Sequence, residues 1–259
     1  ADGRIHAQWQ MDGAKTGRMV SSNPNLQAFP RKLHQYFVPA EGNCLIHGDY
    51  SQIELRVLAQ LSDDSNLLQA FRNNQDIHFQ TAAALLQKNP AAITEEERAL
   101  GKRVNFGICY GISAYGLCKA AAKHGIVLTQ QEADAMKKGF YDTYPQVRRY
   151  HDHLLTSSVI TSLGGRQWID YPKGIARVNL PVQGSAAEGM KLALEMLVEQ
   201  LPEDCLLVNA IHDEIVLECP QTKAGQAEQL LHSCMVTGMQ KLITKIEVKV
   251  TIIKKQRRL

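Results

Sequence analysis

The stretch LLVNAIHDEIVLEC, residues 206–219, decides the fold of this 259-residue chain. Two apolar runs, 206–211 and 215–219, stand on either side of the polar triplet 212–214. Short apolar runs separated by a brief polar turn are typical of a β-hairpin. The sequence therefore predicts a hairpin that carries the acidic residues Asp213 and Glu214 at its tip.

A second strand is expected far upstream of this hairpin. Residues 44–47 are apolar and lead into Gly48-Asp49, and from residue 53 the apolar spacing becomes helical until about 62. Residues 1–43 favour strands and turns, with a loop at 21–25. We therefore predict that Asp49 stands where a strand gives way to a helix.

The middle and the end of the chain favour helices. We predict helices over 77–87, 95–110, 129–142 and 184–200, a turn at 164–165, a last helix over about 222–244 and a final strand of alternating apolar residues from 248. The helix at 95 has the clearest start, because Thr94 and Glu97 have the spacing of a capping box. No internal repeat or low-complexity linker interrupts this order.

One helix carries a stripe of chemically distinct residues. Positions 98, 102, 106 and 110 recur every four residues and hold two cations followed by two aromatic rings: Arg98, Lys102, Phe106 and Tyr110. A nucleoside triphosphate fits this order, with its phosphates at the cations and its sugar and base along the rings. Three glycines in and after this helix, Gly101, Gly107 and Gly111, suggest a close approach to the backbone or a helix end that moves. The alternative is a partly buried helix with surface cations.

Two carboxylates occupy exposed ends of predicted elements. A lone aspartate at a strand end or a hairpin tip is usually a helix cap or a turn residue. Asp49 and Asp213, however, each have a second acidic residue nearby, Glu54 and Glu214. Phosphoryl transfer needs divalent ions that neutralise charge and align the reacting oxygens, and Mg²⁺ requires few protein carboxylates. Together with the cationic stripe, the pair indicates a two-metal site.

The composition is that of an ordinary globular protein, with 44% hydrophobic and 21% charged residues. No apolar run is long enough to span a bilayer and no secretory signal is present, so we expect a soluble intracellular chain with no membrane partner. Because the sequence does not begin with Met, we expect it to be a fragment or processed product of a longer protein. The six cysteines form no CxxC pair and are expected to be reduced core residues. The net charge of +3 identifies no partner.

Three segments in family order resemble the family A DNA polymerases of the bacterial DNA polymerase I type. DYSQIELR (49–56) resembles motif A, RALGKRVNFGICYG (98–111) resembles motif B, and HDE (212–214) resembles motif C. Further segments extend the likeness over nearly the whole chain: TGR (16–18) and PNLQ (24–27) near the start, DIH (76–78), and PVQGSAA (181–187) as a loop and helix start.

The resemblance implies an α+β fold: a polymerase palm with an antiparallel sheet and packed helices, plus a mainly helical fingers subdomain. We expect the palm to cover residues 1–62 and 146–259 and the fingers to cover 63–145. The implied activity is template-directed DNA synthesis, which adds deoxynucleotides to a primer 3′ end and releases pyrophosphate. The implied partners are primer-template DNA, deoxynucleoside triphosphates and two Mg²⁺ ions, for which Mn²⁺ can substitute.

The resemblance also assigns residues. The implied metal ligands are Asp49, Asp213 and the carbonyl of Tyr50. The implied catalytic residues are Asp49, Asp213, Lys102 and Glu214, and the nucleotide-binding residues are Arg98, Lys102, Phe106, Tyr110, His78, Gln52 and Glu54. Within that set, Glu54 is expected to fill the space of a ribose 2′-hydroxyl, and Phe106, where some relatives have Tyr, implies poor acceptance of dideoxynucleotides. The implied DNA contacts are Arg18, Asn25, Asn179, Gln183 and His212. For His78, Glu214 and His212 a structural role is the alternative.

The chain also departs from the family pattern. The likeness begins after the family's thumb, so we expect the thumb and the 3′–5′ exonuclease to lie elsewhere in a longer gene or on another chain, and DNA affinity to be weak and salt-dependent. The segment between Gly165 and Pro181 is shorter than in most relatives, so its template contacts are not carried over. Two alternatives stay open: a single-subunit RNA polymerase, against which Glu54 argues, and a non-catalytic DNA-binding remnant. The sequence does not distinguish a bacterial cytoplasm, a phage-infected cell or an organelle.

Overall fold

The computed structural model describes residues 2–122, 127–171 and 174–256. The chain divides into two compact units. The first, called the sheet unit here, comprises Ala1–Ile53, Gln183–Leu242 and Val248–Leu259, and the second, the helical unit, comprises Glu54–Val182 and Ile243–Glu247. The palm and fingers limits expected at residues 62 and 145 remain predictions.

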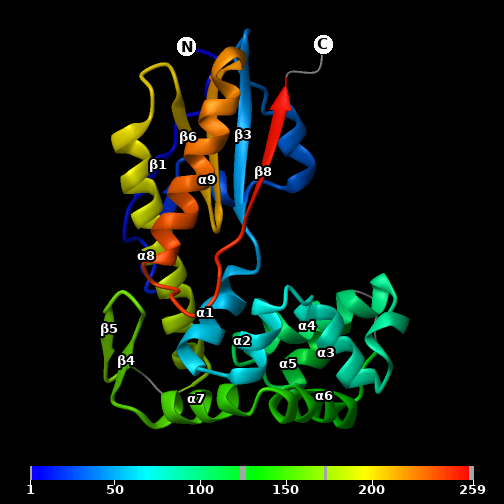
Figure 1. Cartoon of the computed structure of the whole chain (residues 1–259). Coiled ribbons are helices and arrows are strands. Elements are labelled where there is room, and N and C mark those ends of the chain that lie inside the picture. The colour runs from blue at the N-terminus through cyan, green and yellow to red at the C-terminus, as the bar shows by residue number, and fades with distance from the viewer. Residues whose placement is uncertain (1, 123–126, 172–173, 257–259) are drawn as a thin grey trace. The chain divides into compact units, whose positions relative to one another are not determined.

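A four-stranded antiparallel sheet forms the centre of the sheet unit, in the order β6-β7-β3-β8 (Figure 1). Its strands are β6 (Leu206–Ile211), β7 (Glu214–Pro220), β3 (Asn43–Tyr50) and β8 (Val250–Gln256). The predicted hairpin is confirmed, since β6 and β7 pair directly and Ile211 lies opposite Glu214. The last strand begins at Val250, two residues later than its alternating pattern predicted.

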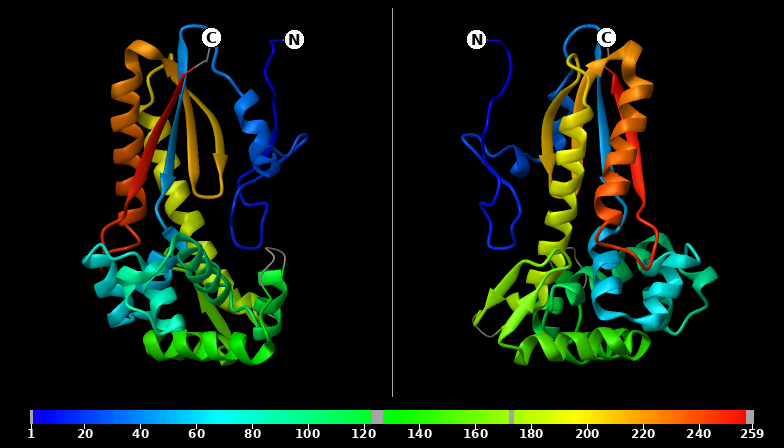
Figure 2. Two further views of the ribbon diagram at one scale, coloured as in Figure 1. Left: turned by 90° about the vertical axis from the view of Figure 1, so that its right-hand side faces the viewer. Right: turned by 60° about the vertical axis from the view of Figure 1, so that its left-hand side comes forward.

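Both faces of this sheet are covered, which explains why β3 and β7 are mostly buried rather than alternately exposed. Helix α9 (Ala224–Gln240) packs on one side, and the first forty residues lie on the other (Figure 2). That N-terminal segment contains β1 (Gln8–Gln10), β2 (Val20–Ser22), and the 3-10 turns η1 (Leu26–Ala28) and η2 (Arg31–Tyr36). A further turn, η4 (Gln221–Lys223), precedes α9, which is shorter at both ends than predicted.

The helical unit contains the helices predicted at 77–87, 95–110 and 129–142, together with elements for which no range was predicted. Its elements are α1 (Ile53–Ser62), α2 (Ser65–Arg72), α3 (Ile77–Leu86), η3 (Pro90–Ala92), α4 (Glu95–Cys109), α5 (Ala114–Ala122), α6 (Gln130–Thr143), α7 (Pro145–Thr156), β4 (Val159–Thr161) and β5 (Gln167–Ile169). The capping box of Thr94 and Glu97 is present. Helix α2 was not predicted, because the Asp64 that caps it stands in a polar run that also marks the end of α1. The turn at 164–165 joins β4 to β5, two strands too short to show a pattern.

Helix α8 (Ala176–Gln200) corrects another expectation. The family resemblance implied a loop and helix start over residues 181–187, and the predicted helix began at about Gly184. In the structure the helix begins eight residues earlier and contains Pro181. The segment resembling a loop and helix start is therefore helical throughout.

All six cysteines are free thiols, and five are buried, which agrees with the predicted core role. Within the described ranges, no helix combines the length and the apolar character needed to cross a membrane.

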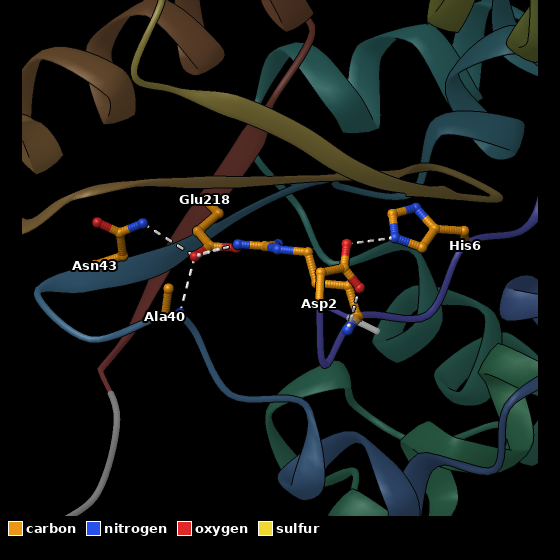
Figure 3. A network of polar contacts seen from close by, with 6 residues as sticks. Asp2, His6, Ala40, Asn43 and Glu218 are labelled. Carbon is orange, nitrogen blue, oxygen red and sulfur yellow. Dashed lines mark hydrogen bonds and ion pairs between the residues drawn. The ribbon is translucent and has the colours of Figure 1, made fainter.

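The buried carboxylate of Glu218 on β7 fastens the N-terminal segment to the sheet (Figure 3). Its oxygens accept hydrogen bonds from the Arg4 guanidinium at 2.8 and 3.2 Å, from the Ala40 amide at 2.9 Å and from the Asn43 side chain at 3.0 Å. Burial acts to raise the pKa of Glu218, but these donors outweigh it and hold the pKa below its ordinary value. The charged carboxylate therefore contributes to stability.

We predict that Glu218→Gln lowers the free energy of unfolding by about 2 kcal/mol at neutral pH, because the amide keeps one acceptor but turns an NH₂ group toward Arg4. Since the folded-state pKa is depressed, this contribution is complete above the unfolded pKa and is lost as pH falls through the folded one. Urea unfolding at pH 7 and at lower pH measures both effects. Exposed Glu199→Gln is the control, and an equal loss at every pH would contradict the linkage.

Candidate active site

Two carboxylates from distant parts of the sequence meet at one end of the four-stranded sheet. Asp49, near the end of β3, lies opposite Glu214 in the strand register. The next amide, that of Tyr50, donates to the Asp213 carbonyl at 3.1 Å. The exposed Asp49 and the half-buried Asp213 are therefore neighbours across adjacent strands. In the sequence alone, Asp49 resembles a helix cap and Asp213 a turn residue. Strand pairing brings the two together in the structure.

The hairpin turn that presents Asp213 has an unusual backbone. Only His212 and Asp213 separate the paired residues Ile211 and Glu214. His212 takes a φ of 54°, in the left-handed region that side-chain-bearing residues seldom occupy. This two-residue turn exposes the His212 side chain at the tip.

A histidine beside the carboxylates was not anticipated from the sequence. His47 precedes Asp49 by two positions on β3, and its Nδ1 pairs with the carboxylate of Glu214. The Nε2 of His47 is buried and has no hydrogen-bond partner among the described residues. The alternation of side chains along a strand could have revealed it, because residues two apart share a face.

The donor set at this end of the sheet suits a hard divalent cation. Carboxylate and carbonyl oxygens are the ligands of Mg²⁺, which retains waters and therefore needs few protein groups. Over the described part of the chain, no group of three or more His, Cys, Asp or Glu side chains has metal-binding geometry. The carboxylate oxygens of Asp49 and Asp213 are donors of the kind that magnesium binds.

In the helical unit, the predicted stripe forms one face of α4. The Lys102 ammonium lies 5.9 Å from the centre of the Phe106 ring, and the Phe106 and Tyr110 rings are 6.3 Å apart. The Tyr110 hydroxyl donates to the carboxylate of Glu54, which is buried at the start of α1. Glu54 and the stripe therefore belong to one cluster, although 44 or more positions separate them in the sequence.

Arg98 begins the stripe and is held by α3. Its Nε and Nη2 donate to Asp76 Oδ2 at 2.9 and 2.8 Å, and its guanidinium lies 5.4 Å from the Phe79 ring centre. Burial acts to raise the pKa of Asp76, but the bonds from Arg98 and from two backbone amides lower it below its ordinary value. Asp76 is therefore ionised at neutral pH.

His78 is buried against α4 rather than exposed as a cation. Burial lowers the pKa of His78 to about 4, so the ring is neutral at physiological pH. Asn105 fixes its tautomer. The Asn105 oxygen accepts from Thr81 at 2.7 Å, and the amide nitrogen lies 3.3 Å from the Ile77 carbonyl and 2.9 Å from His78 Nδ1. Nδ1 is thus an acceptor, and Nε2 carries the proton.

The three glycines of this region serve the fold itself. A Cβ on Gly101 would lie 2.2 Å from the His78 carbonyl oxygen, so the close neighbour is α3. Gly111 has a φ of 71° and ends α4, where the amides of Gly111 and Ile112 donate to the carbonyls of Ile108 and Gly107. This is the Schellman arrangement. A Cβ on Gly107 would lie 2.9 Å from Ile112 Cγ2, so the close approach expected at these glycines is made by α3 and by Ile112.

The residues expected to contact DNA lie in both units. In the sheet unit, Arg18 and His212 line one small pocket together with Met19, Gln27, Ala187, Met190 and Ala210. Asn25 caps η1 by accepting from the amides of Gln27 and Ala28. Gln183 is half-buried on α8. Asn179 belongs to the helical unit, and its Oδ1 is buried without a hydrogen-bond partner among the described residues.

Gln52 stands between the β3 carboxylate and α1. It adopts a φ of 53°, and its Oε1 is buried with no hydrogen-bond partner in the described part of the chain. A left-handed backbone and an unsatisfied buried amide oxygen both raise the free energy of the folded state. Such features are found together at functional sites, so they mark Gln52 as a candidate site residue.

Comparison with known proteins identifies the fold and the family. The structure matches the polymerase domain of Pol1 from M. smegmatis, solved in complex with DNA primer-template and dNTP, with a TM-score of 0.88 and 29% identity over 99% of this chain and 48% of that one. The fold is thus that of a polymerase domain. The family model for DNA polymerase family A matches residues 1–257. The chain belongs to DNA polymerase family A.

Two curated relatives of the chain are both DNA polymerases I. The chain is 37% identical to DNA polymerase I of Caldicellulosiruptor bescii, over 89% of this chain and 29% of that protein. It is 36% identical to DNA polymerase I of Aquifex aeolicus, over 96% of this chain and 45% of that protein. The chain therefore spans less than half the length of these relatives.

Proposed function

We propose that this chain carries out template-directed DNA synthesis, adding deoxynucleotides to a primer 3′ end with release of pyrophosphate. The observation that carries the proposal is that strand register brings Asp49 and Asp213 to the same end of the sheet, in a chain whose α4 also bears a cationic and aromatic face. Family membership supports the same reaction. The palm is proposed to comprise residues 1–62 and 146–259, and the fingers residues 63–145.

The carboxylates of Asp49 and Asp213 and the carbonyl of Tyr50 would hold two Mg²⁺ ions, or Mn²⁺ in their place. Bound there, the ions would neutralise phosphate charge and polarise the attacking and leaving oxygens. The protein's own contribution is to keep these oxygens in place. The Tyr50 hydroxyl, which donates to the Met235 carbonyl at 2.7 Å, anchors the end of β3 to α9.

Nucleotide recognition is proposed for the helical unit. Arg98 and Lys102 would bind the triphosphate, and neutral His78 would donate a hydrogen bond through Nε2 instead of supplying charge. Phe106 and Tyr110 would contact the sugar and base, and Gln52 is proposed as a further nucleotide-binding residue. Glu54, held by Tyr110, would occupy the space of a ribose 2′-hydroxyl and so favour deoxynucleotides.

DNA contacts are proposed for Arg18, Asn25, Asn179, Gln183 and His212, acting on acceptors that all base pairs share in the minor groove. Glu214, paired with His47, is proposed to act near the primer end rather than as a principal ligand. Contacts of this chain to DNA phosphates should weaken as the salt concentration rises, because binding releases counterions.

A primer-extension assay tests the proposed function. With Mg²⁺ and a primed template at low salt, we expect extension with deoxyribonucleoside triphosphates and little with ribonucleoside triphosphates. Extension only with ribonucleotides would reject the DNA polymerase assignment. No extension at high enzyme concentration, with or without an added thumb segment, would favour a non-catalytic DNA-binding role.

A further inference from the structure

The carboxylate of Asp76 makes two sets of bonds within the helical unit. Its Oδ1 caps α3 by accepting from the amides of His78 and Phe79 at 2.8 and 3.1 Å. Its Oδ2 accepts from Nε and Nη2 of Arg98 on α4. One side chain thus joins the start of α3 to the first cation of the α4 stripe.

The way in which Arg98 is bound leaves part of it available for a ligand. A guanidinium carries five N–H donors in a planar fork. Asp76 engages only the edge formed by Nε and Nη2, and the Phe79 ring lies under the guanidinium plane at 5.4 Å. The edge formed by Nη1 and the second Nη2 hydrogen is not used by Asp76. That edge has the geometry for two parallel hydrogen bonds to a phosphate.

We infer that Asp76 is a positioning residue for nucleotide binding, which holds Arg98 so that its remaining edge meets the triphosphate. The inference rests on the proposed function of Arg98. An arginine loses considerable rotamer freedom when it binds a ligand, and Asp76 with Phe79 imposes that order before the nucleotide arrives. Repulsion between the Asp76 carboxylate and the phosphate acts against nucleotide binding. The gain from positioning Arg98 is larger than this repulsion, because Arg98 separates the two anions and its side chain is only 28% exposed.

The substitution Asp76→Asn separates the two sets of bonds. Asparagine keeps an oxygen that can cap α3 but turns an NH₂ group toward Arg98. We expect the KM for the deoxynucleoside triphosphate to rise about tenfold, with kcat changed by less than about threefold and the melting temperature nearly unchanged. In an Arg98→Ala background, Asp76→Asn should have no further effect on KM, as a double-mutant cycle would show.

Glu97→Gln is the matched control. Glu97 also caps a helix with one oxygen, accepting from the Thr94 amide at 2.9 Å, and pairs with a cation, Lys88, through the other. It lies one residue before Arg98, and its carboxylate bonds to Thr94 and Lys88. We expect Glu97→Gln to leave KM unchanged. If Asp76→Asn fails to fold, Phe79→Leu removes only the ring beneath the guanidinium and should raise KM about threefold.

The outcomes separate this inference from the proposed function. If Arg98→Ala raises KM but Asp76→Asn leaves it unchanged or lowers it, positioning is rejected while Arg98 keeps its role. If Arg98→Ala itself leaves KM unchanged, the proposed role of Arg98 fails first. Equal effects of Asp76→Asn in both backgrounds would show that Asp76 acts on stability rather than through Arg98.

Discussion

Primer extension by the Asp213→Asn variant is expected to fall about a thousandfold or more, while its affinity for DNA stays nearly unchanged. Asparagine has almost the same shape as aspartate but lacks the charge that a divalent ion requires. Loss of that charge removes several kcal/mol of electrostatic stabilisation from the transition state, and each 1.36 kcal/mol is tenfold in rate. The backbone bond between the Tyr50 amide and the Asp213 carbonyl does not involve the side chain, so the hairpin should keep its structure.

Single-turnover primer extension measures the rate, and fluorescence anisotropy with labelled primer-template measures DNA affinity at a fixed salt concentration. Asp204→Asn is the control: Asp204 lies just before β6, at the opposite end of the same hairpin, and pairs with Lys223 at 2.7 Å. It should extend primers at the normal rate. Near-normal rates in Asp213→Asn would remove this residue from the metal site, and a parallel loss of DNA affinity would assign it to DNA binding instead.

The second large effect is expected at Gly101, where one methyl group should destabilise the helical unit. A Cβ at this position would lie 2.2 Å from the His78 carbonyl oxygen and 3.0 Å from the Ala82 amide nitrogen, and backbone atoms cannot move aside as a flexible side chain can. Gly101→Ala should therefore lower the free energy of unfolding by about 3 kcal/mol, at the upper end of overpacking costs. Because α3 must move away from α4, the bonds of Asp76 to Arg98 should weaken as well.

Denaturant unfolding gives the stability change, and the KM for nucleotide reports the displaced α4. Gly225→Ala provides a control of opposite sign. Gly225 also lies inside a helix, α9, but a Cβ there would meet nothing within 4 Å. Alanine should stabilise that helix by up to about 1 kcal/mol. Were Gly101→Ala also stabilising, the close packing of α3 on α4 would be disproved.

Local patterns predicted most individual elements correctly. The hairpin β6–β7, the strand β3 and the capped start of α4 follow from apolar runs and from Thr94 with Glu97, all of which act within a few residues. Failures occurred where a neighbour overrules the local signal. Helix α8 continues through Pro181, and the close approach expected at Gly101 is made by α3. Such contacts depend on residues far away in sequence, so no local pattern contains them.

For the candidate site, too, some features follow from the sequence and others only from the tertiary structure. The sequence alone determined which side chains are candidates for the chemistry, because carboxylates at strand ends and cations at a four-residue helical spacing are visible without a fold. Only the tertiary structure decided how they are arranged. Strand register makes Asp49 and Asp213 neighbours. The Glu54 carboxylate accepts a hydrogen bond from the Tyr110 hydroxyl, and burial keeps His78 neutral. Asp76, which has the ordinary role of a helix cap in sequence, becomes the partner of Arg98 only because α3 and α4 pack backbone to backbone at Gly101.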